Sequence, residues 1–183
     1  MDIFKIEPGP NFEGRDLRHA DLRGAYLRGA NLAGCNLEGC NLEGCNFEGA
    51  NLTGANLTGA NLTNGRLDDA NLTGANLTGA NLRGAYIGGG LRGPIGANLT
   101  RANLTKANLE DASFDHACLY RANLTGANLE GAEFRGANLT EANLTGAMLL
   151  RTNFRGANLT DAILDVAYAK EVYGHKAFGQ QSQ

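Results

Sequence analysis

The sequence has few aromatic residues and no tryptophan, so large rings cannot fill most of its interior. Phe, Tyr and Trp together make up 7% of the 183 residues. No stretch approaches the roughly 18 consecutive apolar residues of a membrane span. The N-terminal stretch MDIFKIEPGP lacks the basic region and apolar run of a signal peptide. We therefore expect one domain in the cytoplasm, without a membrane as partner.

Charge of either sign is also limited. The formal net charge is −3, whereas a nucleic-acid partner usually requires a basic surface. The sequence therefore does not favour nucleic acid as a partner.

Cysteine is scarce as well. Of the four residues Cys35, Cys40, Cys45 and Cys118, the first three fall at one position of a repeat. We interpret them as packing residues, without a disulfide framework or a metal site.

What the sequence does contain is a repeat of five residues, as in the stretch ANLTGANLTGANL from Ala50 to Leu62. Each repeat has a large apolar centre, usually with Asn directly before it and Ala two residues before it. The centres recur in 16 copies from Phe12 to Ile87 and in 14 copies from Leu99 to Leu164. Because 30 copies keep one phase, an ordered repeat is the better interpretation than low-complexity disorder.

A period of five fits neither an α-helix nor one long strand. Successive centres on a helix would be rotated by about 140° and would form no stripe, and strand alternation has a period of two. The Ala and the centre are two residues apart, so both can point inward from a short extended segment. Gly and Asn tolerate positive φ and stand where a turn is then needed. We predict a solenoid that bends once per repeat.

Bulky substitutions recur at multiples of 20 residues. They are Phe114, Phe134 and Phe154 among the centres, and Tyr26, Arg66 and Tyr86 in the Asn position. Stacked neighbours on one face of a four-sided coil would recur in this way. We therefore infer four repeats per coil and a rod of seven and a half coils, about 36 Å long at about 4.8 Å per coil.

The tandem motif A-(N/D)-L-x-x, from residue 10 to 166, resembles the pentapeptide repeat family. The resemblance implies an all-β fold, the right-handed quadrilateral β-helix, and its handedness comes from the resemblance alone. The family has roles in bacterial regulation, particularly in photosynthetic bacteria. It also includes quinolone-resistance proteins, which resemble duplex DNA and bind DNA gyrase, and some members form dimers through a C-terminal segment.

We divide the chain into an N-terminal cap (1–9), a first repeat run (10–89), a Gly-rich loop (90–96), a second run (97–166) and a C-terminal cap helix with its tail (163–178). From Ile87 to Leu99 is 12 residues, two more than a pair of repeats. We therefore expect Leu91 or Ile95 to fill a missing inward position. The insertion is either a tolerated bulge or a recognition loop.

The C-terminal segment changes period. Leu164, Tyr168 and Val172 are spaced by four, with Tyr173 beside them, which predicts a short amphipathic helix over 163–173. It would cap the last coil, or Tyr168 and Tyr173 would pair two chains. The chain is therefore expected to be a monomer or a homodimer.

No nucleophile, phosphate-binding or zinc-ligand motif is present, so we expect no enzyme activity, catalytic residue, cofactor or metal. We predict a rigid scaffold that binds a protein not identified by the sequence. Its candidate surface combines acidic residues with the loop: Glu38, Glu43, Glu48, Asp68, Asp69, Leu91, Arg92 and Ile95. The alternatives are a DNA mimic that modulates gyrase and, less favoured, ice binding through Thr ladders.

Overall fold

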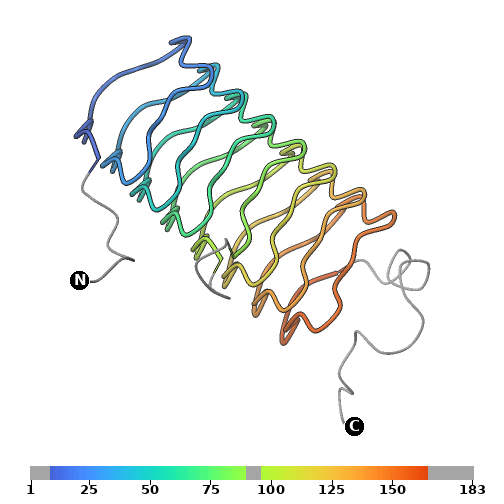
Figure 1. The fold of residues 1–183 in the computed structure, drawn as a ribbon. Helices are drawn as coiled ribbons and strands as arrows, with labels where there is room; N and C mark the ends of the chain where they lie inside the picture. Colours follow the sequence, from blue (N-terminus) through green and yellow to red (C-terminus); the bar gives the residue numbers. More distant parts are fainter. Residues whose placement is uncertain (1–8, 90–95, 165–183) are drawn as a thin grey trace, which may run out of the picture.

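The structure, a computed structural model, describes residues 9–89 and 96–164. In these residues the chain winds into four-sided coils that stack along one axis (Figure 1). Each strand is a single residue that forms a parallel bridge with a residue of the next coil, from the pair Asn11–Asn31 to the pair Asn143–Ile163. The described residues contain no helix. Most bridges join residues 20 apart, which confirms four repeats per coil.

The chain bends at each corner through a tight turn. The inward Ala donates its N–H to the carbonyl of the centre three residues earlier, as Ala55 does to Leu52 over 3.0 Å. The second residue after the centre has positive φ, such as 64° at Gly54, which glycine adopts without strain. The prediction that Asn supplies positive φ is wrong. Among the described asparagines only Asn64, which stands in the Gly position, has it; the repeat asparagines form the bridges.

The Ala and centre side chains fill the interior of the coil. From Ala30 to Leu144, the described residues at these positions are almost all at most 1% exposed. The Phe114 and Phe134 rings stack with centroids 4.7 Å apart, and the Phe134 and Phe154 rings with centroids 5.2 Å apart. Phenylalanines spaced by 20 residues are therefore stacked neighbours on one face, as predicted.

The chain enters and leaves the glycine-rich insertion at a single corner. Ala97 donates its N–H to the Ile87 carbonyl over 2.9 Å, as an inward Ala does to its centre in the other corners. The bridges across this corner join residues 27 apart instead of 20, so the insertion adds seven residues and no repeat. The expectation of a missing inward position is wrong. Leu91 and Ile95, which were expected to fill it, lie outside the described residues.

The two ends of the insertion press against the next coil. A Cβ atom at Gly88 would lie 2.8 Å from the backbone N and O of Asp115, and one at Gly96 would lie 2.7 Å from the backbone N of Ala117. Real Cβ atoms essentially never come this close to the backbone. Glycine is therefore required at both ends for the coil to continue across the insertion.

The described chain ends inside the repeat register. Ile163 donates its N–H to the Ala142 carbonyl over 2.9 Å and bridges with Asn143, while Leu164 packs half-buried against the core. The predicted C-terminal helix therefore does not begin at 163. Its remaining residues, with Tyr168, Val172 and Tyr173, lie outside the described residues, as do residues 1–8 of the predicted N-terminal cap.

Candidate functional site

The outer surface has four faces, which we number in chain order by the repeats centred on Phe12, Leu17, Leu22 and Leu27. Each face continues one repeat per coil along the rod. Its outward positions are the residue before each centre, which is the bridge position, and the residue after the centre; the corner residues, such as exposed Arg101 and Lys106, lie between neighbouring faces. Whether the chain can bind or react with anything depends on these outward and corner positions, because the centre and the Ala point inward.

The first two faces carry ladders of Asn and Thr whose polar groups bond to one another. The Asn56 Oδ1 accepts the Thr58 N–H over 3.1 Å and its hydroxyl over 2.6 Å. The Thr58 hydroxyl in turn accepts an Asn76 Nδ2 donor at 2.9 Å. These bonds explain why Asn precedes each centre, since its side chain holds the corner turn. They also occupy the Thr hydroxyl groups, so they give no support to the ice-binding alternative.

The fourth face departs from this pattern in most of its coils. Its bridge positions keep Asn at only two of seven coils, whereas the first face keeps Asn at seven of eight. The bridge residues of the fourth face are Tyr26, Asn46, Arg66, Tyr86, Ser113, Glu133 and Asn153, and the residues after its centres are Arg28, Glu48, Asp68, Gly88, Asp115, Arg135 and Arg155. Tyr26 and Tyr86 are 69% and 59% exposed. Large rings on a flat polar surface are typical of contact sites.

The charges near the N-terminal end of the fourth face form one network. Glu48 lies 3.4 Å from the Arg28 guanidinium and 3.8 Å from that of Arg66, and Arg66 lies 3.2 Å from Asp68. The side chains of Glu48 and Asp68 are only 12% and 9% exposed. This part of the face is therefore locally neutral, although it contains several charged residues.

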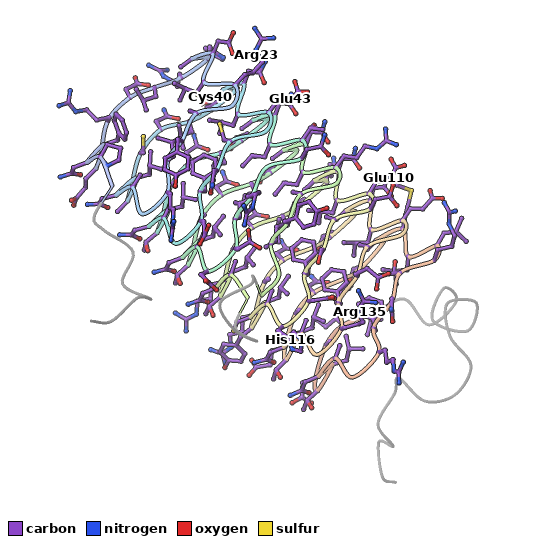
Figure 2. All side chains as sticks on the ribbon, viewed as in Figure 1. Arg23, Cys40, Glu43, Glu110, His116 and Arg135 are labelled. Carbon is purple, nitrogen blue, oxygen red and sulfur yellow. The ribbon has the colours of Figure 1, made fainter. Side chains whose placement is uncertain are left out.

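A second network lies further along the same face. The Arg135 Nε donates to Asp115 over 3.0 Å, and its Nη1 lies 3.6 Å from Glu133. The hydrogen bond to the Asp115 carboxylate raises the pKa of Arg135 above its usual value. Figure 2 shows Arg135 and His116 on the outside of the rod at this end of the face. The Arg135 and Glu133 side chains are 53% and 35% exposed, so a partner can reach both.

The predicted acidic ring is opposed by arginines one coil away. Arg18, Arg23 and Arg28 occupy the same outward position as Glu38, Glu43 and Glu48, 20 residues earlier. The hydrogen bond to Asp16 raises the pKa of Arg18, and the Glu38 carboxylate adds a smaller contribution. Asp21 and Glu43 act in the same order on the pKa of Arg23. The three glutamates therefore lie in a surface of mixed charge, on three different faces.

Of the other residues of the candidate surface, the structure describes only Asp68 and Asp69. Asp68 is nearly buried beside Arg66, and Asp69 forms a corner with a φ of 58°. Leu91, Arg92 and Ile95 lie outside the described residues. Sequence reasoning noticed Tyr26, Arg66 and Tyr86 only as markers of the coil size. Their recurrence on one face was the signal for a distinct surface.

The three repeat cysteines are buried thiols that replace inward Ala. The Cys40 Sγ donates to the Leu17 carbonyl over 2.8 Å, and burial raises the pKa of the Cys40 thiol; Figure 2 shows the Cys40 sulfur inside the coil. Buried Thr152 makes the same kind of bond to Leu129 over 2.8 Å. A small donor therefore fits the Ala position. Among residues 9–89 and 96–164, no three potential metal ligands are grouped.

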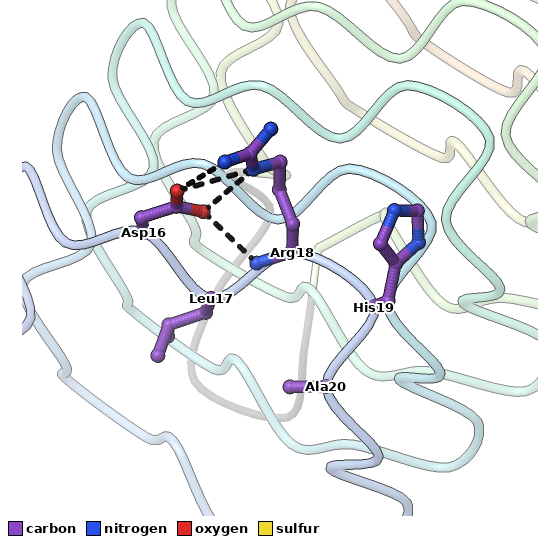
Figure 3. A pocket seen from close by; sticks show the side chains of 5 residues that line it. All are labelled: Asp16, Leu17, Arg18, His19 and Ala20. Atoms are coloured by element: carbon purple, nitrogen blue, oxygen red, sulfur yellow. Dashed lines mark hydrogen bonds and ion pairs between the residues drawn. The ribbon is translucent and has the colours of Figure 1, made fainter.

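A shallow, open depression lies at the first coil, lined by residues 16–20 (Figure 3). It is formed by consecutive residues of the chain. The Arg18 guanidinium donates to Asp16 at 2.8–3.1 Å and lowers the pKa of that carboxylate, while His19 projects beside them. Asp16 and Arg18 are exposed and bond to each other, so the pair offers no activated group for catalysis.

Within the described part of the chain, no helix has the length and hydropathy to cross a membrane.

The sequence profile described as "Pentapeptide repeats" matches residues 11–44, 30–68, 50–87, 95–131 and 127–165, with eight copies. The chain belongs to the pentapeptide repeat family, and its fold is the right-handed quadrilateral β-helix of that family. Members of this family are generally non-enzymatic scaffolds, which confirms the scaffold predicted from the sequence. No curated protein matches the chain.

Several solved structures are similar to this chain. HetL of the cyanobacterium Nostoc sp. strain PCC 7120, involved in heterocyst differentiation regulation, shares 37% identity over 85% of this chain and 72% of its own, with a TM-score of 0.45. A pentapeptide repeat protein from the thylakoid lumen of Arabidopsis thaliana shares 34% identity over 55% and 69%, with a TM-score of 0.43. The plasmid-mediated fluoroquinolone resistance protein QnrB1 shares 24% identity over 90% and 88%, with a TM-score of 0.42.

Proposed function

We propose that this chain is a non-catalytic scaffold that binds a protein through its fourth face. The observation that carries this proposal is the loss of the Asn ladder on that face alone, where Tyr26, Arg66 and Tyr86 take its place. The other faces repeat a self-satisfied polar pattern over most of their length. A partner that recognises this chain specifically has most to contact on the fourth face.

The residue types on this face suit binding to a protein. Tyr and Arg are the residues most often found at the energetic centres of protein interfaces. They stand on a backbone in which every coil is bonded to the next, such as Arg66 N–H to the Cys45 carbonyl over 2.9 Å. Little backbone freedom is therefore lost on binding. Because the charges are paired within the face, we expect this binding to depend only weakly on salt.

The proposal predicts that restoring the repeat pattern abolishes binding without unfolding the chain. In the variant Tyr26→Asn/Arg66→Asn/Tyr86→Asn, the affinity-tagged chain should retain less than about a tenth of the proteins that the wild type captures from an extract of its source cells. Removal of the contact residues at the centre of an interface accounts for such a loss. The captured proteins are compared by quantitative mass spectrometry.

Met148→Asn provides the matched control. Met148 is an exposed apolar residue in the Asn position of the third face, 50% exposed, so its variant makes the same kind of change elsewhere. It should capture the same proteins as the wild type. Equal capture by the fourth-face variant, with an unchanged circular dichroism spectrum, would rule out this surface.

The gyrase alternative from the sequence has less structural support. Acidic residues along the rod are paired with arginines, as in Arg83 with Glu110 at 3.4 Å and Arg151 with Glu130 at 2.7 Å, whereas DNA mimicry needs a dense negative surface. We expect no inhibition of gyrase supercoiling, and no protection from a quinolone, at about a tenfold molar excess of the chain. Inhibition that weakens as salt rises would instead favour this alternative.

A further inference from the structure

In each coil of the fourth face, the two outward residues form a complementary pair. From the first coil to the last, the pairs are Tyr26 with Arg28, Asn46 with Glu48, Arg66 with Asp68, Tyr86 with Gly88, Ser113 with Asp115, Glu133 with Arg135, and Asn153 with Arg155. Two pairs have opposite charges, three join a neutral hydrogen-bonding group to a charge, one sets a ring beside a cation, and one sets a ring beside a glycine. No pair has like charges.

This pattern makes the face complementary to itself. Two copies can turn their fourth faces toward each other about a two-fold axis that runs parallel to the rods, between the two faces. In this arrangement equal coils meet, and the residue before the centre in one copy lies opposite the residue after the centre in the other. Arg66 then faces Asp68 of the second copy, and Glu133 faces Arg135 of the second copy. The symmetry repeats every contact, as an isologous interface requires.

We infer that the fourth face binds a second copy of this chain, with the two rods side by side and parallel. The two exposed rings fit this arrangement. Tyr26 meets the Arg28 guanidinium of the second copy, which favours a cation–π contact. Tyr86 meets Gly88 of the second copy, which has no side chain of its own. The inference rests on the proposed function, because both take the fourth face as the binding surface.

The antiparallel arrangement with full overlap is disfavoured by charge. It pairs coils in reverse order and keeps the position within each repeat. Asp68 would then face Asp115 of the other copy, and Arg28 would face Arg155. Like charges placed opposite each other at an interface are unfavourable. Only the parallel arrangement places opposite charges against each other both in the coil of Arg66 and Asp68 and in the coil of Glu133 and Arg135.

The size of the face sets the expected strength of the dimer. Seven coils at about 4.8 Å give a contact about 34 Å long. With a width of one repeat, two such faces bury on the order of 1,000 Å² in total, near the lower end for specific interfaces. We therefore expect dissociation in the micromolar range, where concentration decides whether the chain is a monomer or a dimer.

Sedimentation equilibrium of the purified full-length chain, from about 1 to 300 μM, tests the inference. The wild type should approach twice the 19.2 kDa mass of one chain, with little change when salt is raised. Tyr26→Asn/Tyr86→Asn should raise the dissociation constant at least tenfold, and Met148→Asn should leave it unchanged. A wild-type monomer at all concentrations would overturn the inference, as would a dimer that the tyrosine variant leaves intact.

A charge exchange tests the parallel arrangement. Glu133→Arg/Arg135→Glu should still form dimers with itself, because each new charge again meets its opposite. Mixed with the wild type, it places Arg opposite Arg and Glu opposite Glu. Co-purification of differently tagged chains should then yield at least tenfold fewer mixed dimers than random pairing, with the circular dichroism spectrum of the variant as the folding control. Mixed dimers at the random proportion would overturn the parallel arrangement.

The two proposals fail separately. If the purified chain stays monomeric but its capture of other proteins still requires Tyr26, Arg66 and Tyr86, the inferred dimer is wrong and the scaffold function stands. If neither the mass nor the captured proteins respond to these residues, the fourth face is no binding surface and both proposals fail.

Discussion

Phe134→Ala is expected to lower the free energy of unfolding by about 3–5 kcal/mol, the usual cost of removing a buried ring. The Phe134 ring is fully buried between two others, with its centroid 4.7 Å from that of Phe114 and 5.2 Å from that of Phe154. Truncation removes both stacking contacts and leaves a cavity. The single backbone bridges around it hold the coils in place, so the cavity cannot collapse easily.

Urea unfolding followed by circular dichroism measures this loss. Phe134→Leu, which restores the commonest centre of the repeat, serves as the control and should cost less than about 1.5 kcal/mol. Since each coil contacts only its neighbours, the alanine variant should also increase amide exchange in the coils of Phe114 and Phe154 more than in distant coils. A loss below about 1 kcal/mol would show that the ring stack contributes little to stability.

Ala75→Leu is expected to destabilise the chain by roughly 1–3 kcal/mol, because it overpacks the coil. Ala75 is 0% exposed, and the bridges on either side of its neighbour Asn76 place it in line with inward Ala55 and Ala102. Every coil after the first has the same narrow slot, where Cys and Thr are the largest described residues. A leucine there must push the backbone bonds apart or adopt a strained rotamer.

A leucine introduced on the outside of the coil distinguishes the effect of overpacking from the effect of adding a leucine. Arg83→Leu introduces the same side chain where the present one is 57% exposed, and it should change stability by less than about 0.5 kcal/mol. The difference between the two melting curves reports the inward position. Equal melting temperatures for Ala75→Leu and the wild type would contradict the assignment of Ala to the interior.

Much of the fold could be predicted because the same pattern, a large apolar centre that recurs every five residues, occurs 30 times. Bulky residues at multiples of 20, Phe114, Phe134 and Phe154 and also Tyr26, Arg66 and Tyr86, set the number of repeats per coil, since residues at that spacing stack. The insertion was miscounted because periodicity cannot tell where extra residues leave the coil. The Ala97-to-Ile87 hydrogen bond, visible only in three dimensions, shows that they begin and end at one corner.

The candidate surface was harder to predict. Glu38, Glu43 and Glu48 stood out as a run of acids in the sequence, but the stacking puts arginines above them. Charges of neighbouring coils compensate each other between residues 20 apart in the sequence. A search for runs of like charge in the sequence does not detect such pairs. Tyr26 and Tyr86 were recognised as departures from the pattern. Their exposure, and the contrast between their face and the Asn–Thr ladders, required the structure.

Hydroxyl-radical footprinting of Tyr26 and Tyr86 tests the central claim, that the fourth face is the binding surface, most directly. The tagged chain is oxidised when dilute and pure, and again in a concentrated extract of its source cells. Peptides are quantified by mass spectrometry, with exposed Met148 of the third face as the internal reference. We predict that oxidation of both tyrosines falls severalfold relative to Met148 in the extract, because a second copy or another protein covers them. Unchanged oxidation of both tyrosines relative to Met148 would contradict the claim.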